Sequence, residues 1–161
     1  MVEQFNFKEI NSVLFICMGN LCRSPSAEAV FRHKITEQGI DLTIDSAGTS
    51  GSHVREKPDH RAVKAGEARG YSFDKLRARK VTAQDFSEFD MVIAMDKDNI
   101  RELKKVAPAE QHHKIVLFLD FADSFDDSEV PDPYYGGARG FQLVLDMLEA
   151  ASEGLIDKLK S

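Results

Sequence analysis

Apolar residues fall in short, separated runs along this chain, and their spacing alternates between that typical of strands and that typical of helices. Strand-like runs occur at four places, which are 13–16, 42–47, 91–95 and 115–119. Helical spacing occurs in four further segments, which are 24–38, 58–69, 97–106 and 140–160. Strands and helices are therefore predicted to alternate along the whole sequence.

Such an alternation is typical of an α/β fold, with a central, mostly parallel sheet of about four strands and helices on both faces, joined by right-handed crossovers. We expect residues 1–161 to form one domain, with 1–11 as a flexible N-terminal extension. In sheets of this kind, ligands bind at the carboxyl ends of the strands. The segments that leave this edge follow Ile16, Ala47, Met95 and Leu119.

The loop after the first predicted strand carries the most informative chemistry. It begins with Cys17 and ends with Arg23 and Ser24, and the pair Ser24-Pro25 predicts an N-cap followed by the first helical residue. Backbone N–H groups in such a turn, together with the helix N-terminus, favour a multiply charged oxyanion. Arg23 supplies a planar fork for two of its oxygens. We predict a phosphate-binding loop over Met18–Ser24, with Cys17 as a thiol nucleophile.

Charge and hydropathy limit the kinds of binding partner that this chain can have. The chain has 27 acidic and 21 basic residues and a formal net charge of -6, which argues against nucleic-acid binding and offers no polybasic membrane patch. No apolar run is long enough to span a membrane, and residues 1–11 carry charges among their apolar positions. We therefore expect a cytoplasmic protein with no membrane partner.

The cysteines and histidines favour reactive chemistry over a structural role. Cys17 and Cys22 lie five positions apart, which is too few cysteines for a disulfide scaffold and too few ligands for a structural zinc site. The five histidines are scattered along the chain. We expect no metal site and no cofactor.

Two segments together resemble a known family. Cys-Met-Gly-Asn-Leu-Cys-Arg-Ser-Pro at 17–25 and Asp-Pro-Tyr-Tyr at 132–135 resemble the low-molecular-weight protein tyrosine phosphatases. Similar segments recur over nearly the whole chain, at 45–49, 58–62, 78–79 and 95–96. The resemblance implies metal-independent hydrolysis of tyrosine-phosphorylated proteins or small aryl phosphates, with inorganic phosphate as a product.

The chemistry of the residues agrees with that expectation. Cys17 would attack phosphorus as a thiolate and form a cysteinyl-phosphate, while Arg23 and the loop amides stabilise the equatorial oxygens. Asp132, which lies between Pro131 and Pro133, is the candidate general acid, and it would serve as a base toward water in the second step.

Three polar residues are candidates for supporting the loop. Asn tolerates left-handed backbone angles, and the resemblance implies that the Asn20 amide bonds Ser46 and holds the loop open. Ser24 would donate a hydrogen bond to the sulfur of Cys17 and ease its departure. A plain helix cap is the alternative role for Ser24.

Five residues besides the loop backbone are expected to shape the substrate cleft. An apolar Leu21 suits a phenyl ring, and the resemblance places Tyr134 and Tyr135 on one wall of the cleft, although both could be ordinary packing aromatics. Many relatives carry an aromatic residue at the position of Ser52, which cannot stack on a ring. His53 beside it is a partial substitute for the aromatic ring. We therefore expect weaker binding of aryl phosphates than in relatives that have an aromatic wall.

The two cysteines also suggest redox control. A labile disulfide between Cys17 and Cys22 would switch activity off and protect Cys17 from irreversible oxidation. Cys22 as a space-filling residue is the alternative. We expect a monomer or a weak homodimer.

Three other functions remain open on the sequence. Arsenate reductases on this fold need additional cysteines, and none follows Cys22. Phosphoarginine phosphatases carry a small Thr where this chain has Leu21. A non-catalytic phosphate-binding module is the third, and the presence of both Cys17 and Asp132 speaks against it.

Overall fold

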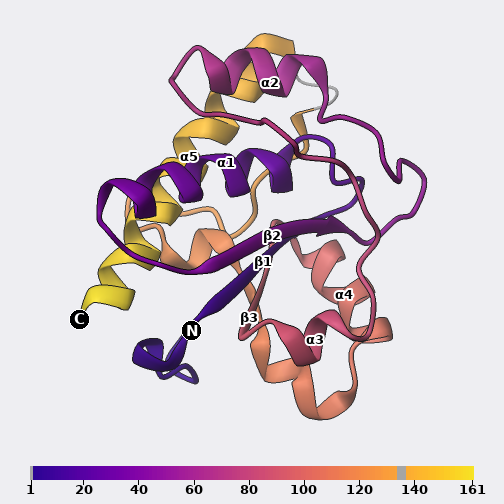
Figure 1. The fold of residues 1–161 in the computed structure, drawn as a ribbon, viewed down its shortest axis with the longest axis vertical. Helices are drawn as coiled ribbons and strands as arrows, with labels where there is room; N and C mark the ends of the chain where they lie inside the picture. Colours follow the sequence, from indigo (N-terminus) through magenta and orange to yellow (C-terminus); the bar gives the residue numbers. More distant parts are fainter. Residues whose placement is uncertain (1, 134–136) are drawn as a thin grey trace.

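The expected parallel sheet is present. A computed structural model describes residues 2–133 and 137–161, and within them four strands pair in the order β2-β1-β3-β4, all parallel (Figure 1). The strands are β1 (Ser12–Cys17), β2 (Thr43–Gly48), β3 (Met91–Ala94) and β4 (Ile115–Leu117). The α/β fold predicted from the sequence is confirmed.

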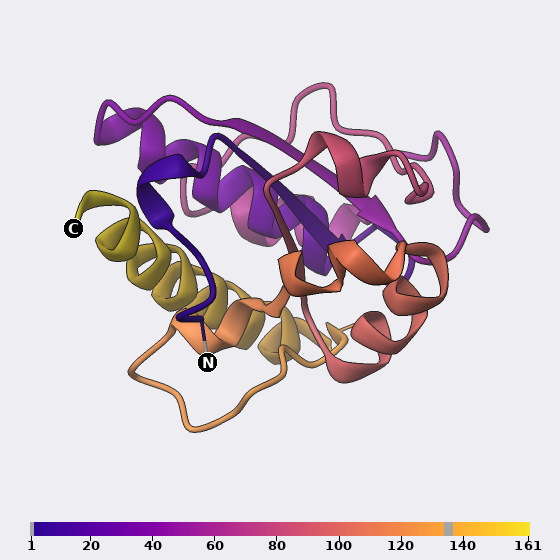
Figure 2. The same ribbon diagram turned by 90° about the horizontal axis from the view of Figure 1, so that it is seen from below.

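Helices cover both faces of the sheet, as Figures 1 and 2 show. They are α1 (Arg23–Glu37), α2 (His60–Glu67), α3 (Asp85–Glu88), α4 (Lys97–Val106) and α5 (Gly137–Lys160), with 3-10 turns η1 (Phe7–Glu9), η2 (Ala109–Lys114) and η3 (Phe118–Phe121). The bounds of α4 agree with the predicted helix. The predicted strand 115–119 is shorter than expected, because the chain turns into η3 after Leu117.

Alternating side chains of β1 divide the core between the two faces. Val13 and Phe15 pack with the apolar sides of α1 and α5, whereas Leu14 and Ile16 pack with those of α3 and α4. All four are fully buried, which explains the uninterrupted apolar run. The central strand is thereby held from both sides, and its carboxyl end is a rigid platform for the loop that follows.

The N-terminal segment, for which we expected a flexible extension, contributes to this core. Val2 and Ile10 are buried within the cluster formed by α1 and α5, and Phe5 and Phe7 pack against it. The Phe7 ring meets the Phe121 ring edge-on, with 6.1 Å between centroids. Residues 2–10 therefore cover part of the α5 side of the sheet.

The strand order places a topological switch between β1 and β3. The chain leaves β1 toward β2 on one side, and later returns to pair β3 on the other side. Ligand sites in open parallel sheets lie at the carboxyl edge of such a switch. The loop after Cys17 leaves the sheet at this point.

Candidate active site

The loop 17–23 joins β1 to α1, and the helix begins earlier than the sequence predicts. Helix α1 begins at Arg23, with Cys22 as its N-cap and no side-chain cap hydrogen bond. The prediction that Ser24 caps the helix and Pro25 is its first residue is therefore wrong by two positions. Pro25 is still tolerated, because it stands in the first turn, where backbone N–H groups have no helical acceptor. The Ser24 side chain is left available for other contacts.

The sulfur of Cys17 is surrounded by hydrogen-bond donors. Its Sγ atom lies 3.0 Å from Ser24 Oγ and accepts a hydrogen bond of 3.3 Å from the backbone N–H of Asn20. The N-terminus of the 15-residue helix α1 is close by and adds partial positive charge. Each of these contacts can stabilise negative charge that develops on the sulfur.

Asn20 holds the loop in an unusual backbone conformation. Its φ of 57° lies in the left-handed region, which Asn adopts more readily than most residues. Its side-chain Nδ2 donates to Ser24 Oγ at 2.7 Å and to Ser46 Oγ at 3.0 Å, and its Oδ1 accepts from the backbone N–H of Arg79 at 3.0 Å. The structure thus brings together Asn20, Ser24 and Ser46, the three candidates for supporting the loop, and adds a contact between Asn20 and Ser24.

The end of β2 also fits closely against the loop. A Cβ atom at Gly48 would lie 2.7 Å from the carbonyl oxygen of Met18, so a larger residue would push the loop away. The backbone N–H of Thr49 donates to the carbonyl of Cys17, and that of Ser50 to the carbonyl of Met18. The first two loop carbonyls are therefore turned outward toward β2.

Arg23 is buried and firmly oriented. Its Nη1 donates to Asp96 Oδ2 at 2.6 Å and to the carbonyl of Val130 at 3.0 Å, while its Nη2 lies 3.9 Å from Asp132 Oδ2. Burial opposes the charge of this guanidinium, but the negative charges of Cys17, Asp96 and Asp132 outweigh it and raise the pKa of Arg23. The cation is thus held beside the nucleophile in a fixed direction.

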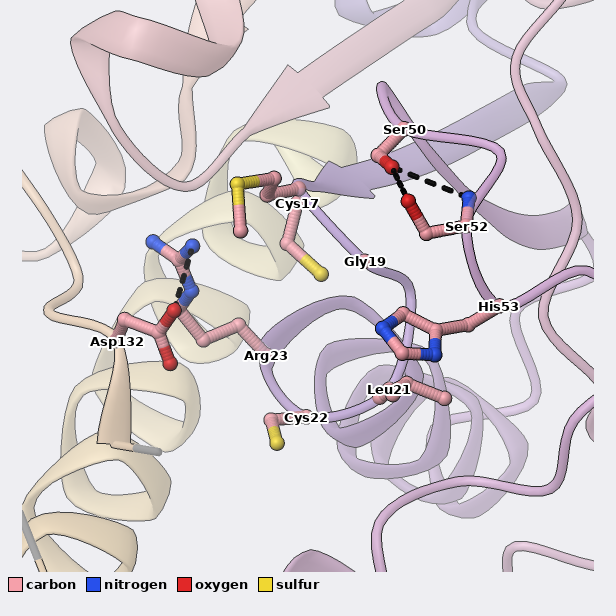
Figure 3. Close-up of a pocket in the computed structure, with 10 residues that line it drawn as sticks. Cys17, Gly19, Leu21, Cys22, Arg23, Ser50, Ser52, His53 and Asp132 are labelled. Carbon is pink, nitrogen blue, oxygen red and sulfur yellow. Dashed lines mark hydrogen bonds and ion pairs between the residues drawn. The ribbon is translucent and has the colours of Figure 1, made fainter. Parts of the chain in front are cut away.

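These side chains line a cavity of about 320 Å³ (Figure 3). Arg23 and Asp132 lie together on one side of it, and Ser50, Ser52 and His53 lie on the opposite side. The complete lining is Cys17, Met18, Gly19, Leu21, Cys22, Arg23, Ser50, Ser52, His53 and Asp132. Asn20, Ser24 and Ser46 are buried outside this lining, so they support the loop from behind.

The wall opposite Asp132 is polar at Ser52, the position where many relatives carry an aromatic residue. Ser52 Oγ lies 2.7 Å from Ser50 Oγ, and His53 Nδ1 lies 2.7 Å from Glu56 Oε2. The His53 ring is half-buried next to Gly19. A flat ring therefore lines the cavity one position after the serine, although it is smaller than an indole.

Cys22 lies within the same cavity, and both cysteines are free thiols in this structure. Burial, together with the charges of Asp59, Cys17 and Asp132, raises the pKa of Cys22 to about 12. The Cys22 thiol is consequently almost entirely protonated at pH 7. Tyr134 and Tyr135, predicted for the cleft wall, lie outside the described residues.

Sequence reasoning missed two charged residues of the site. Asp96 follows β3 at the carboxyl edge of the sheet, a position that could have signalled its role beside Arg23. Glu28 is 3% exposed and accepts a hydrogen bond from Ser46 Oγ. No local pattern marks Glu28, because its burial depends on β2.

Two further searches concern only the described residues. Within 2–133 and 137–161, no group of three or more His, Cys, Asp or Glu side chains could hold a metal ion. No helix in the same part of the chain combines the length and apolar character needed to cross a membrane.

A doubly wound sheet with a thiol and an arginine in one loop at its switch point defines a class of proteins, those with a cysteine-containing phosphate-binding loop. Comparison with known proteins narrows this class. A profile of the family described as "Low molecular weight phosphotyrosine protein phosphatase" matches residues 12–161. This chain therefore belongs to that family, whose reaction is the hydrolysis of phosphotyrosine with release of phosphate.

Individual relatives agree with this assignment. A low molecular weight protein-tyrosine-phosphatase of Streptomyces coelicolor is 44% identical over 149 residues, which are 89% of this chain and 90% of the relative. A crystal structure of a protein tyrosine phosphatase from Entamoeba histolytica, with Hepes in the active site, has a TM-score of 0.90, 44% identity and coverage of 93% of this chain and 97% of its own. YfkJ from Bacillus subtilis has a TM-score of 0.88, 38% identity and coverage of 94% and 96%.

Proposed function

We propose that this phosphatase works in two steps with Cys17 as nucleophile, Asp132 as general acid and base, and Arg23 as the cation that holds the phosphoryl group. The observation that carries the proposal is the meeting of these three side chains around one cavity, with Arg23 Nη2 3.9 Å from Asp132 Oδ2. Its substrates are tyrosine-phosphorylated proteins or small aryl phosphates.

In the first step, the Cys17 thiolate attacks phosphorus from the floor of the cavity. A sulfur–phosphorus bond forms and the phosphorus–oxygen bond to the phenol breaks, while Asp132 gives its proton to the departing oxygen. Asp132 has a side chain 38% exposed at the cavity edge, where a leaving group would emerge. The enzyme is left with a cysteinyl-phosphate and an ionised Asp132.

In the second step, water attacks the same phosphorus atom. Asp132 now accepts a proton from that water, the sulfur–phosphorus bond breaks, and inorganic phosphate is released. The departing thiolate regains its hydrogen bonds from Ser24 Oγ and the Asn20 N–H. Those two donors therefore assist the departure of sulfur as well as its initial ionisation.

Arg23 and the loop amides act on the equatorial oxygens in both steps. Removing one donor that is already oriented toward developing charge costs about 3 kcal/mol in the oxyanion holes of acyl-transfer enzymes, and donors to a phosphoryl group act by the same principle. Asp96 keeps Arg23 oriented before substrate arrives, because its carboxylate and the Val130 carbonyl hold the same nitrogen. The second nitrogen, Nη2, remains directed toward Asp132 and the cavity.

Leu21 favours a phenyl ring over a more polar group. Its side chain lines the cavity next to His53, so an aryl ring entering above the loop would meet an apolar surface beside an imidazole. Phosphotyrosine is therefore the preferred substrate, ahead of phosphoserine, which is too short to reach this surface, and ahead of phosphoarginine.

The proposal is tested by offering matched phosphotyrosine, phosphoserine and phosphoarginine peptides to the wild type, to Cys17→Ser and to Cys22→Ser. We expect the wild type and Cys22→Ser to release phosphate from the phosphotyrosine peptide, and Cys17→Ser to release none. Turnover by Cys17→Ser would reject the nucleophile, and preference for phosphoarginine would reject the substrate.

A further inference from the structure

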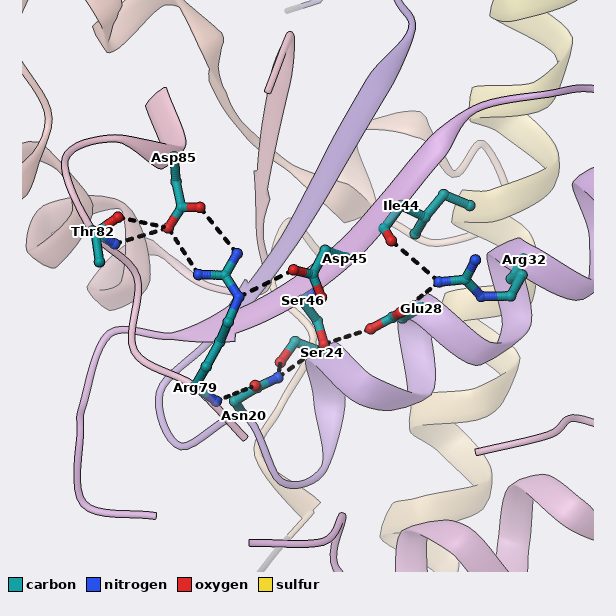
Figure 4. Close-up of polar contacts among 10 residues, drawn as sticks. All are labelled: Asn20, Ser24, Glu28, Arg32, Ile44, Asp45, Ser46, Arg79, Thr82 and Asp85. Atoms are coloured by element: carbon teal, nitrogen blue, oxygen red, sulfur yellow. Dashed lines mark hydrogen bonds and ion pairs between the residues drawn. The ribbon is translucent and has the colours of Figure 1, made fainter. Parts of the chain in front are cut away.

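Behind the phosphate-binding loop lies a chain of hydrogen bonds that connects Cys17 to a buried carboxyl group. It runs from Cys17 Sγ through Ser24, Asn20 and Ser46 to Glu28 Oε1, with consecutive distances of 3.0, 2.7, 3.0 and 2.7 Å (Figure 4). Every hydrogen bond in it joins side chains that are buried. Glu28 has no role in the two-step reaction above, so its position needs an explanation.

The direction of each hydrogen bond follows from the ends of the chain. The Arg79 N–H donates to Asn20 Oδ1, which fixes the amide so that both hydrogens of Nδ2 point toward Ser24 and Ser46. Each serine oxygen therefore accepts from Asn20 and must send its own hydrogen elsewhere. Ser24 then donates to the Cys17 sulfur.

Glu28 receives the other hydrogen. Ser46 Oγ donates to Glu28 Oε1 at 2.7 Å. Arg32 pairs with the second oxygen, Oε2, and also donates to the carbonyl of Ile44. The carboxylate is thus fixed between β2 and the exposed face of α1.

The Arg79 backbone is itself held in place. Its guanidinium binds both oxygens of Asp85, at 3.1 and 3.0 Å, and its Nε donates to Asp45 Oδ2 at 3.1 Å. The contacts with Asp85 lie on the opposite side of Asn20 from Glu28 (Figure 4). The amide of Asn20 is accordingly oriented from both ends.

Packing alone does not account for Glu28. Its side chain is 4% exposed, and burying an unneeded carboxylate at this position would be costly. Burial raises the pKa of Glu28, and the hydrogen bonds from Ser46 and Arg32 oppose that rise. Residues 24, 28 and 32 are four positions apart on one face of α1, so the same helix aligns Ser24 with the carboxylate and its arginine.

We propose that Glu28 is a positioning residue for catalysis: as an obligate acceptor for Ser46, it fixes Asn20 and so keeps the Ser24 hydroxyl directed at the Cys17 sulfur. Without that acceptor, the Ser46 hydroxyl has no partner for its hydrogen and can rotate. Asn20 then loses one of its two supports, and the donor to the sulfur becomes less well oriented. This inference rests on the proposed nucleophilic role of Cys17.

The test compares Glu28→Ala, Glu28→Gln and Ser24→Ala, each alone, with the double variant Glu28→Ala/Ser24→Ala. Glu37→Gln, an exposed carboxyl on the same helix, is the matched control. The measurements are kcat and KM for p-nitrophenyl phosphate, and the rate of iodoacetate alkylation at Cys17 as a function of pH. Mass spectrometry of peptides confirms which cysteine reacts, and thermal melting confirms folding.

Loss of one hydrogen bond to the nucleophile predicts a fall in kcat of about tenfold for Glu28→Ala, with KM unchanged. Glu28→Gln keeps an acceptor oxygen and should retain more activity than Glu28→Ala. Alkylation of Glu28→Ala should require a higher pH than in the wild type, and Ser24→Ala should behave similarly. Glu37→Gln should match the wild type.

The double variant decides between positioning and general damage. If Glu28 acts through Ser24, then adding Glu28→Ala to Ser24→Ala has no further effect on kcat or on alkylation. Effects that multiply, an unchanged kcat in Glu28→Ala, or equal losses in Glu28→Gln and Glu28→Ala would overturn the inference. An active Cys17→Ser would instead overturn the proposed function itself.

Discussion

The carboxylate of Asp96 accepts a hydrogen bond of 2.6 Å from the guanidinium of Arg23, so the end of β3 orients the cation that serves the loop after β1. Its two oxygens have separate partners. Oδ2 contacts Arg23, and Oδ1 accepts from the backbone N–H of Asn99 in the capping box of α4. A substitution of Asp96 can therefore remove the contact with Arg23 while the cap of α4 is kept.

Replacing Asp96 with asparagine is expected to impair catalysis with little loss of stability. The carbonyl oxygen of the new side chain can still cap α4, but an amide N–H now faces the Arg23 donor. Loss of a charged hydrogen bond of roughly 1.5–3 kcal/mol predicts a fall in kcat/KM of roughly ten- to a hundredfold. Steady-state kinetics and thermal melting measure the two effects.

Glu129→Gln is the control for this substitution. Glu129 accepts from the backbone N–H of Lys97 at the same helix end, and its carboxylate does not take part in the described contacts of Arg23. We expect its kcat/KM to remain close to that of the wild type. Equal losses in Asp96→Asn and Glu129→Gln would assign the effect to α4 rather than to Arg23.

Asp132→Asn tests the proton donor. Removing a general acid is expected to lower kcat/KM, which reports the step in which the phenol leaves, by roughly 10²–10⁴-fold, and the loss should be greatest for poor leaving groups. Comparison of phenyl phosphate with 2,4-dinitrophenyl phosphate measures this dependence, because the dinitrophenolate leaves without a proton. A similar loss for both esters would argue against Asp132 as the acid.

The wild type itself should show a bell-shaped rate profile. The proposed first step needs a sulfur anion as nucleophile and a proton on the general acid at the same time, so the rate should fall toward both low and high pH. A buffer series at constant ionic strength measures kcat/KM. A rate that is flat between about pH 4 and 8 would contradict the acid assignment.

Ser52→Trp is expected to tighten the binding of aryl phosphates. Ser52 is exposed at the cavity wall opposite Asp132, and an indole there would supply the flat surface that Ser52 lacks. A stacking contact of about 1 kcal/mol predicts a several-fold lower KM for p-nitrophenyl phosphate. Ser52→Ala controls for loss of the hydroxyl, and an alkyl phosphate controls for the ring. An equal fall in KM for the alkyl phosphate would contradict the explanation.

The raised pKa of Cys22 predicts how the rate of disulfide formation with Cys17 depends on pH. Peroxide would first convert the Cys17 thiolate to a sulfenic acid, and the Cys22 thiolate would then displace hydroxide from it to form a disulfide. Since burial raises the pKa of Cys22 to about 12, its thiolate fraction rises about tenfold for each pH unit below that value. Disulfide closure after peroxide treatment should therefore accelerate with pH, as competition with dimedone trapping measures.

The matched variant for this prediction is Cys22→Ser. Thiol treatment should restore the activity of the oxidised wild type but leave most of the loss in Cys22→Ser. Equal recovery of activity in both proteins would show that Cys22 does not protect Cys17 from irreversible oxidation. A closure rate that does not change between about pH 6 and 9 would show that Cys22 does not attack as a thiolate.

Much of the fold could be predicted because its signals are local. The buried run in β1 and the helical spacing of α4 are each visible within one segment, and α4 has the predicted bounds. The predicted start of α1 is wrong because Ser24 followed by Pro25 is the residue pair typical of an N-cap and a first helical position. In the structure, the Ser24 side chain bonds Cys17 and Asn20 instead of the helix backbone.

The supporting residues could be predicted only in part. Asn20 and Ser46 were found through the family resemblance, whereas Glu28 was not. Its carboxylate is buried because parallel pairing of β2 with β1 brings Ser46 to a residue 18 positions earlier in the chain. Contacts of this kind depend on tertiary packing, and no periodicity within α1 reports them.

The most direct test of the account is detection of phosphate on the nucleophile itself. Asp132→Ala should still be phosphorylated by 2,4-dinitrophenyl phosphate but hydrolyse the intermediate slowly, so acid quenching within a turnover should trap it. We predict one phosphoryl group per enzyme, located by peptide mass spectrometry on Cys17 and absent from Cys17→Ser. Phosphate on another residue, or full turnover with no adduct on Cys17, would contradict the account.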